Sequence, residues 1–258
     1  MASSRIPRSF YVVLTAVALL APSIATAEPY LATYVGAAFT EPKDLDTRVR
    51  LDTFTIVDGT ARDLKFETSV VVGGKVGYFF GASLLGGNVG LEAEAYHFQP
   101  DAMQQSSRFV GSLGGAPADR LVRVQHADLD VTGAALNVLY RVPLATSAEL
   151  PRGRFQPYAG VGLAVLIAKL STTTTPFDVN KTISATDVQP ALQVLGGVRM
   201  FLSPHVAVFV EYKFLQSETF TFDFREAGTV GGAPFVETAR DRADLTSHHI
   251  SFGVGVHW

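Results

Sequence analysis

The chain has 258 residues, no cysteine, 21 basic and 24 acidic residues, and a net charge of -3. The lack of cysteine excludes disulfides, thiolate metal sites and a lipid anchor on cysteine. The even charge balance and the absence of a basic run argue against nucleic acid as a partner. A mean hydropathy of +0.22 is high for a soluble protein.

The N-terminal segment has the parts of a secretory signal peptide. Basic residues precede the apolar stretch Tyr11–Ala21, and Ala25-Thr26-Ala27 forms an A-x-A cleavage site. The alternative is a membrane anchor, but the apolar stretch is well short of the ~20 residues that a spanning helix needs. We therefore expect residues 1–27 to be a cleaved signal peptide and residues 28–258 to form one β-barrel domain.

Eight later segments alternate with a period of two, which is typical of β-strands with two different faces. One face is apolar and the other is small or polar, although the two faces of the first segment are poorly distinguished. The predicted strands are Tyr30–Phe39, Thr68–Phe80, Val89–Phe98, Leu121–Val142, Phe155–Lys169, Asp187–Phe201, His205–Phe214 and His248–Trp258.

The connections between these segments alternate in length. Bacterial outer-membrane barrels keep short periplasmic turns and longer external loops, so an N-terminus in the periplasm would place every long connection outside. Short or intermediate connections are predicted at Gly81–Asn88, Pro143–Arg154 and Ser203-Pro204. Long polar surface loops are predicted at Thr40–Glu67, with a turn at Asp58-Gly59, and at Gln99–Arg120, Ser171–Thr182 and Gln216–Ala243.

The last strand shows the pattern most clearly. Ile250, Phe252, Val254, Val256 and Trp258 share one face, and the other carries histidine, serine and glycine. A soluble β-sandwich or lipocalin-like barrel also alternates, but the glycine- and alanine-rich second faces would make a poor water-exposed surface. The sequence therefore predicts an all-β protein, an eight-stranded antiparallel transmembrane β-barrel with long external loops.

Seven charged residues fall on the inward parity of the predicted strands. Because a charge facing lipid is costly, this shared parity indicates a polar lumen. We expect Lys75 to pair with Glu92 or Glu94, and Arg199 to pair with Glu211. The alternatives are an electrostatic plug and a narrow ion path; an eight-stranded barrel is just wide enough for its side chains to fill it, which favours the plug. The predicted lumen network comprises Lys75, Glu92, Glu94, Arg141, Arg199, Glu211 and Lys213.

Signals for catalysis and for metal binding are weak. His249-Ile250-Ser251 is the one nucleophile-plus-base spacing, and no acid is placed to orient the histidine, so we expect no enzyme activity. The six histidines show no metal-ligand spacing. Acidic residues such as Asp128 and Asp130 could hold a divalent cation weakly, but we expect them to be solvated. The sequence therefore predicts no metal site and no cofactor.

Three motifs carry a family resemblance: PYAGVGLAV at Pro157–Val165, VFVEYKF at Val208–Phe214, and the terminal SFGVGVHW. With the signal peptide, they resemble the small bacterial outer-membrane β-barrel family, the OmpA-like and Opa-like group, over Glu28–Trp258. The resemblance implies the Gram-negative outer membrane and a role in membrane integrity, adhesion or slow permeation. The chain departs from the two-domain OmpA pattern, since no peptidoglycan-binding segment follows the barrel, and it ends in Trp where Phe is commoner.

The resemblance also implies partners. The terminal strand resembles the signal that the barrel-assembly machinery reads, with Phe252, Val254, Val256 and Trp258 as its apolar residues. Expected partners are outer-membrane lipid, lipopolysaccharide, periplasmic chaperones and that machinery, with a possible external ligand or host surface. The predicted function is structural or surface-interacting; the alternatives are a narrow porin-like channel and, more distantly, a lipid A-modifying hydrolase.

Overall fold

The computed structural model describes residues 28–52, 54–172, 182–230 and 233–258, and leaves the side chains of 228–234 undescribed. Within these ranges the regular structure is β-strand, in fourteen elements. No helix in the described part of the chain is long and apolar enough to cross a bilayer. The signal peptide predicted at 1–27 lies outside the described residues.

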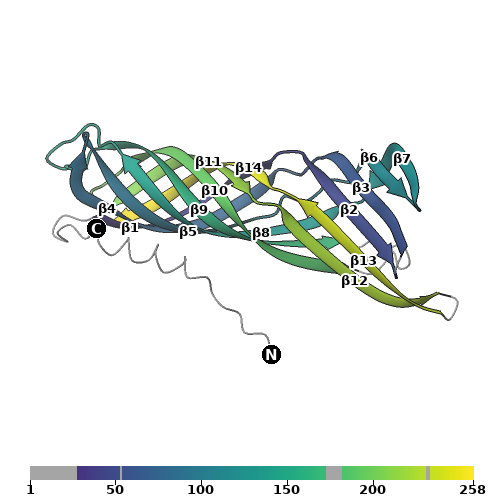
Figure 1. Cartoon of the computed structure of the whole chain (residues 1–258). Helices are drawn as coiled ribbons and strands as arrows, with labels where there is room; N and C mark the ends of the chain where they lie inside the picture. The colour runs from purple at the N-terminus through teal and green to yellow at the C-terminus, as the bar shows by residue number, and fades with distance from the viewer. Residues whose placement is uncertain (1–27, 53, 173–181, 231–232) are drawn as a thin grey trace, which may run out of the picture.

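Eight strands close into an antiparallel barrel in the order β1-β14-β11-β10-β9-β8-β5-β4, and β1 pairs with both β14 and β4 (Figure 1). Closure leaves no unpaired sheet edge, which is the condition for strands to span lipid. The predicted fold class is therefore confirmed. The barrel strands are β1 (Glu28–Thr40), β4 (Ser69–Leu84), β5 (Gly87–Phe98), β8 (Ala127–Arg141), β9 (Phe155–Thr172), β10 (Ile183–Phe201), β11 (Val206–Ser217) and β14 (Thr246–His257).

The other six strands form a second sheet that extends from the end of the barrel opposite the C-terminus (Figure 1). We call it the distal sheet. Its order is β12-β13-β2-β3-β6-β7, so three hairpins from separate connections lie side by side. Its strands are β2 (Lys43–Leu51), β3 (Phe54–Leu64), β6 (Gln105–Leu113), β7 (Ala116–Val124), β12 (Phe220–Val230) and β13 (Ala233–Ala243).

The distal sheet corrects the prediction that three long connections are irregular surface loops. Thr40–Glu67, Gln99–Arg120 and Gln216–Ala243 each contain strands of this sheet. Their polar residues alternate with Leu, Val and Phe, so the period of two is present, but the high polar content resembles a loop. The fourth such segment, Ser171–Thr182, falls mostly outside the described residues.

Two further boundaries differ from the prediction. The predicted strand Leu121–Val142 is two strands, because β7 ends at Val124 in the distal sheet and β8 begins at Ala127 in the barrel. The turn predicted at Asp58-Gly59 is wrong: both residues lie inside β3, paired with β2 and β6. The chain instead reverses near Asp52, whose φ is 51°.

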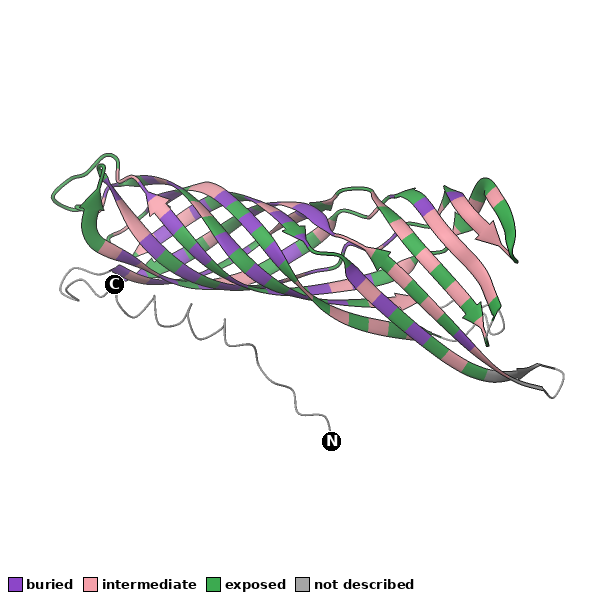
Figure 2. Ribbon diagram, in the orientation of Figure 1, coloured by how far each residue is buried: buried purple, intermediate pink, exposed green. Residues whose placement is uncertain are grey.

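Burial alternates along the barrel strands as predicted (Figure 2). Because the exposed parity is apolar, the outer wall matches the hydrocarbon of a bilayer. Each barrel strand carries exposed aliphatic side chains on this wall, and most strands have one that is about half exposed or more. On β5 and β11 the exposures are 38% for Leu91 and 46% for Val210. This wall includes Leu31, Val35, Val70, Val76, Leu136, Val138, Val161, Leu163, Val188, Val194, Phe252, Val254 and Val256.

Glycines on the inward face make room for aromatic rings. A Cβ added to Gly77 would overlap the ring of Tyr30, and one added to Gly133 would overlap the ring of Tyr96. A tyrosine ring can therefore lie flat against the wall and carry its hydroxyl to the centre of the lumen. This explains why the inward parity alternates glycine with large polar residues.

Candidate functional site: the lumen and the distal sheet

The centre of the lumen holds a cluster of buried charges. Lys75 of β4 places Nζ 2.6 and 2.7 Å from the two carboxylate oxygens of Glu211 on β11. The same Nζ lies 3.5 Å from Glu92 and 3.7 Å from Glu94. Lys213 of β11 pairs with Glu94 and lies 4.0 Å from Glu211. We call these five residues the lumen cluster; each is at most 4% exposed.

Hydroxyl and amide groups complete the lumen cluster. Because it has three carboxylates and two ammonium groups, neutral donors are needed to satisfy the remaining acceptor oxygens. Tyr30 donates to Glu92 at 2.6 Å, Tyr34 to Glu94 at 2.5 Å, and Tyr158 to Glu211 at 3.0 Å. Asn137 donates to Glu92 at 2.9 Å and Gln193 to Glu94 at 3.1 Å.

A second buried cluster lies where β1 begins and β14 ends. The Glu28 carboxylate accepts from Arg141 at 2.5 Å and pairs with Nδ1 of His257 at 2.6 Å. Arg141 also donates to Gln156 at 3.1 Å. Arg141, predicted as part of one lumen network, thus belongs to a group separate from the lumen cluster. The two clusters lie at different heights along the barrel axis.

Arg199 lies between the two clusters without the predicted partner. No ion pair joins it to Glu211 or to another described carboxylate, since Gly197 and not Arg199 is opposite Glu211 in the register. Its guanidinium instead lies 4.5 Å from the ring centre of Tyr30 and 5.5 Å from those of Phe79 and Tyr158. Stacking on ring faces stabilises a cation in a dry interior.

His249 and Ser251 do not form a catalytic pair. Both ring nitrogens of His249 are buried without a hydrogen-bond partner, and the ring packs against Phe98 at 4.8 Å. Ser251 Oγ lies 3.5 Å from the carbonyl oxygen of Glu211. A nucleophile needs a base within hydrogen-bond reach, and His249 does not supply one here.

The distal sheet carries a row of arginines on one face. Cross-strand register places Arg240 of β13 opposite Arg48 of β2, and Arg225 and Arg50 on either side of Thr238. Two of these arginines form ion pairs with acids on their outer sides: Arg48 lies 3.0 Å from Asp58, and Arg240 lies 2.6 Å from Asp223. Arg50, Arg225 and Arg242 are exposed and form no ion pair with a described residue. We call the five arginines the arginine face.

Two shallow depressions lie on this face. One is lined by Arg48, Arg240 and Arg242 together with neighbouring Asp and Thr side chains, with a volume of about 280 Å³. The other, of about 370 Å³, is lined by Arg48, Arg50, Arg225 and Arg240. Guanidinium groups thus converge on both hollows.

The opposite face of the distal sheet buries an acid. Asp241 of β13 is opposite Thr47 of β2 and Phe222 of β12. Its Oδ1 is buried without a hydrogen-bond partner. Burial raises the pKa of the Asp241 carboxyl group to about 6, and a hydrogen bond with Thr47 opposes the shift.

We expect this acid to make the distal sheet less stable as the pH rises. Because the folded pKa lies above the unfolded value of ~3.9, the folded sheet binds more protons, and stability is lost between pH 4 and 6. Asp241→Asn should remove this dependence and increase the opening free energy at pH 7 by about 3 kcal/mol. Hydrogen exchange of β13 amides at pH 5 and 7 measures it; an unchanged pH slope in the variant would contradict the assignment.

Sequence reasoning missed several residues of both clusters. Tyr30 and Tyr34 belong to the one strand whose two faces are poorly distinguished. Asn137 and Gln193 fall on the predicted inward parity, but the predicted network included charged residues alone and so omitted these two amides. Glu28 and His257 sit at the ends of β1 and β14, where only the closure of these strands against each other brings them together.

Solved structures of outer-membrane barrels are similar to this chain. OprG from Pseudomonas aeruginosa is 15% identical, with 89% of this chain and 95% of that chain covered and a TM-score of 0.47. Neisserial surface protein A is 13% identical, with 89% and 97% covered and a TM-score of 0.43. The outer membrane protease OmpT from Escherichia coli is 7% identical, with 91% and 99% covered and a TM-score of 0.45.

No curated protein matches the sequence. The family described as "Outer membrane protein beta-barrel domain" matches residues 11–257, nearly the whole chain. This match agrees with the closed ring, its apolar outer wall and its polar interior. The chain therefore belongs to the outer-membrane β-barrel family, and its place is the Gram-negative outer membrane, among lipid and lipopolysaccharide.

Proposed function

We propose that this protein is a surface-interaction barrel: a rigid, internally closed ring that holds the distal sheet outside the cell as a binding surface. The observation that carries the proposal is the arginine face. The short β4–β5 and β10–β11 turns lie at the end that bears the C-terminus, which corresponds to the periplasm in barrels of this kind, so the distal sheet faces the exterior.

The arginine face supports an anionic ligand. Like charges directly opposite each other on a sheet are destabilising, and Arg48 lies directly opposite Arg240. Asp58 and Asp223 offset part of that repulsion from the outer sides, and an anion seated between the two arginines would offset more of it. Guanidinium groups bind sulfate and phosphate with two parallel hydrogen bonds. The ligand class that fits is therefore a polyanion that carries sulfate or phosphate groups.

The contacts inside the lumen favour a closed barrel and not an ion-conducting channel. Side chains from seven of the eight barrel strands meet in the lumen cluster or donate to it, and its charged groups are satisfied by ion pairs and by hydrogen bonds from neutral donors. An ion path would require these buried pairs to separate, which costs several kcal/mol for each buried charge left without its partner. The unassembled His249–Ser251 pair likewise gives a lipid hydrolase no support, so we propose no enzymatic role.

The proposal includes the route to the membrane. Residues 1–27 would serve as a cleaved signal peptide, and Phe252, Val254, Val256 and Trp258 as the segment read by periplasmic chaperones and the barrel-assembly machinery. Three observations agree with the second part. Phe252, Val254 and Val256 lie on the outer face of β14, and Trp258 directly follows that strand. All four side chains are at least 47% exposed, and β14 closes the ring on β1.

Binding of a polyanion tests the proposed function. Wild-type protein should bind dextran sulfate and not neutral dextran, and Arg50→Gln with Arg225→Gln should weaken binding roughly tenfold, because two charge-assisted contacts are lost. Arg108→Gln is the matched control, since Arg108 is an exposed arginine of the same sheet already paired with Asp119 at 2.7 Å. Surface plasmon resonance at two salt concentrations gives the affinities.

Two outcomes would contradict the proposal. One is binding of neutral and sulfated dextran alike, and the other is an equal loss of affinity in the Arg108 control and the double variant. Planar-bilayer recording checks the closed lumen: we expect a silent bilayer. Steady conductance steps that disappear in Glu211→Gln would favour the narrow channel instead.

A further inference from the structure

A cluster of possible metal ligands lies where the distal sheet joins the barrel. Asp101 comes from the link between β5 and β6, His126 from the link between β7 and β8, and Asp128 from the first residues of β8. Backbone hydrogen bonds tie the two links together, with Ala102 N to Ala127 O at 2.9 Å and Ala127 N to Ala102 O at 3.3 Å. The side chains are thus carried on a paired and ordered part of the backbone.

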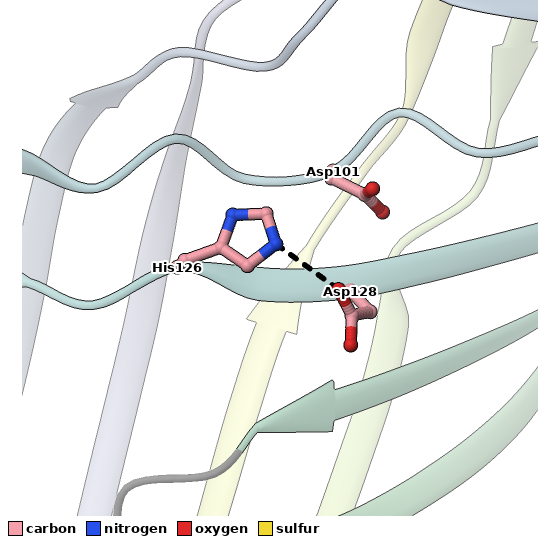
Figure 3. Close-up of side chains that lie close together, drawn as sticks. All are labelled: Asp101, His126 and Asp128. Atoms are coloured by element: carbon pink, nitrogen blue, oxygen red, sulfur yellow. Dashed lines mark hydrogen bonds and ion pairs between the residues drawn. The ribbon is translucent and has the colours of Figure 1, made fainter.

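The three side chains lie close together (Figure 3). His126 Nε2 lies 3.0 Å from Asp128 Oδ1, and one ligand atom from each of the three residues lies within 4.8 Å of the others. Asp101 Oδ1 accepts the backbone N–H of Leu129 at 2.9 Å, which fixes the carboxylate and leaves Oδ2 for a ligand. The Asp128 side chain is more than half exposed and the His126 side chain is half exposed, so both can change conformation to meet a ligand.

Negative charge at this cluster is not compensated by the protein. No Lys or Arg in the described part of the chain forms an ion pair with Asp101 or Asp128, although other acids of the junction have partners. A bound cation would balance the negative charge of both carboxylates.

We propose that Asp101, His126 and Asp128 bind a divalent transition-metal cation of the Zn²⁺ class. Two carboxylates and one imidazole are three ligands, and a water would occupy the fourth tetrahedral position. Bonds of ~2.0–2.1 Å place tetrahedral ligand atoms about 3.4 Å apart, close to the 3.0 Å between His126 and Asp128. The imidazole selects against Mg²⁺ and Ca²⁺, which prefer oxygen ligands.

The bound cation would clamp the distal sheet to the barrel. Asp101 and His126 flank the β6–β7 hairpin, one before β6 and one after β7. One ion joined to both stems therefore restrains the whole hairpin relative to β8. This role is independent of the arginine face, which lies on β2, β12 and β13.

Calorimetric titration of Zn²⁺ into the untagged, refolded full chain in detergent, after chelator treatment, tests the proposal. We expect saturable binding of one Zn²⁺ and weaker binding of Mg²⁺. Asp101→Asn, Asp128→Asn and His126→Gln should each reduce the Zn²⁺ affinity at least tenfold. Asp101→Asn keeps an oxygen acceptor for Leu129 N–H, so its effect reports the lost ligand charge and not the lost backbone contact.

His248→Gln is the matched control, because His248 Nε2 lies 3.0 Å from Glu41 Oε1 in a pair without a third ligand. Its Zn²⁺ affinity should equal that of wild type. Mobility of unboiled samples in gels establishes that each variant is a folded barrel. The proposal is overturned by absence of saturable Zn²⁺ binding, by equal affinities in wild type and the Asp variants, or by an equal loss in His248→Gln. A second readout is protection of the β6–β7 hairpin from proteolysis, which Zn²⁺ should increase in wild type and not in Asp128→Asn.

Discussion

Replacing Lys75 with Met is expected to lower the free energy of unfolding by about 3–5 kcal/mol, the usual cost of removing one partner from a buried ion pair. Lys75 is 3% exposed and lies within 4 Å of three carboxylates. Its removal leaves Glu92, Glu94 and Glu211 with Lys213 as the one ammonium group of the lumen cluster. Denaturant titration of the refolded barrel, followed by gel mobility, measures the loss.

Two further variants separate the lumen cluster from general effects of the substitution. Lys169→Met removes an exposed lysine of β9 and should change stability by well under 1 kcal/mol. Combining Lys75→Met with Glu211→Gln should restore part of the loss, because the closest uncompensated carboxylate is then neutral. A Lys75→Met barrel as stable as Lys169→Met would mean that the lumen cluster contributes nothing to closure.

Replacing Gly77 with Val is expected to cost about 3 kcal/mol. A Cβ at this position overlaps the ring of Tyr30, so the ring must move away from the wall. Overpacking of this kind costs ~1–3 kcal/mol, and an orphaned buried acceptor costs a similar amount. The acceptor here is Glu92, which would lose the 2.6 Å hydrogen bond from Tyr30.

Gly74 provides the matched control on the same strand. A Cβ there meets a backbone oxygen at 3.7 Å, an ordinary contact, and points to the opposite side of β4. Gly74→Val should therefore leave the unfolding midpoint nearly unchanged. Equal midpoints for Gly77→Val and Gly74→Val would show that Tyr30 does not depend on the lumenal glycine.

The alternation of residues predicted the barrel because each spanning strand has lipid on one side and the lumen on the other. β14 illustrates the point: Phe252 is 59% exposed, whereas Ser251 is 3% exposed. The same reasoning located the lumen-facing charges on their strands. It also located the hairpin pair Lys75 and Glu94, which lie opposite each other in adjacent strands.

Which charged side chains meet across the lumen was harder to predict from the sequence. The partner closest to Lys75 is Glu211, which reaches it across the lumen from β11, with β1 and β14 between their strands around the ring. Arg199 was paired with Glu211 by sequence proximity to the Ser203-Pro204 turn, but the register places Phe209 opposite it. Which charges meet depends on the shear of the whole ring, and no single hairpin contains that information.

The sequence by itself determined the closed ring, its apolar outer wall and the polarity of its interior, because a period of two and a hydrocarbon solvent allow few other solutions. Tertiary structure alone decided that three polar connections become one distal sheet, since their strands pair with segments far away in the chain. It also decided the arginine face and the meeting of Asp101 with His126. The arginine face arises from register between separate hairpins, whereas Asp101 meets His126 because the β6–β7 hairpin brings its two ends together. In both cases pairing within the assembled sheet decides which side chains meet.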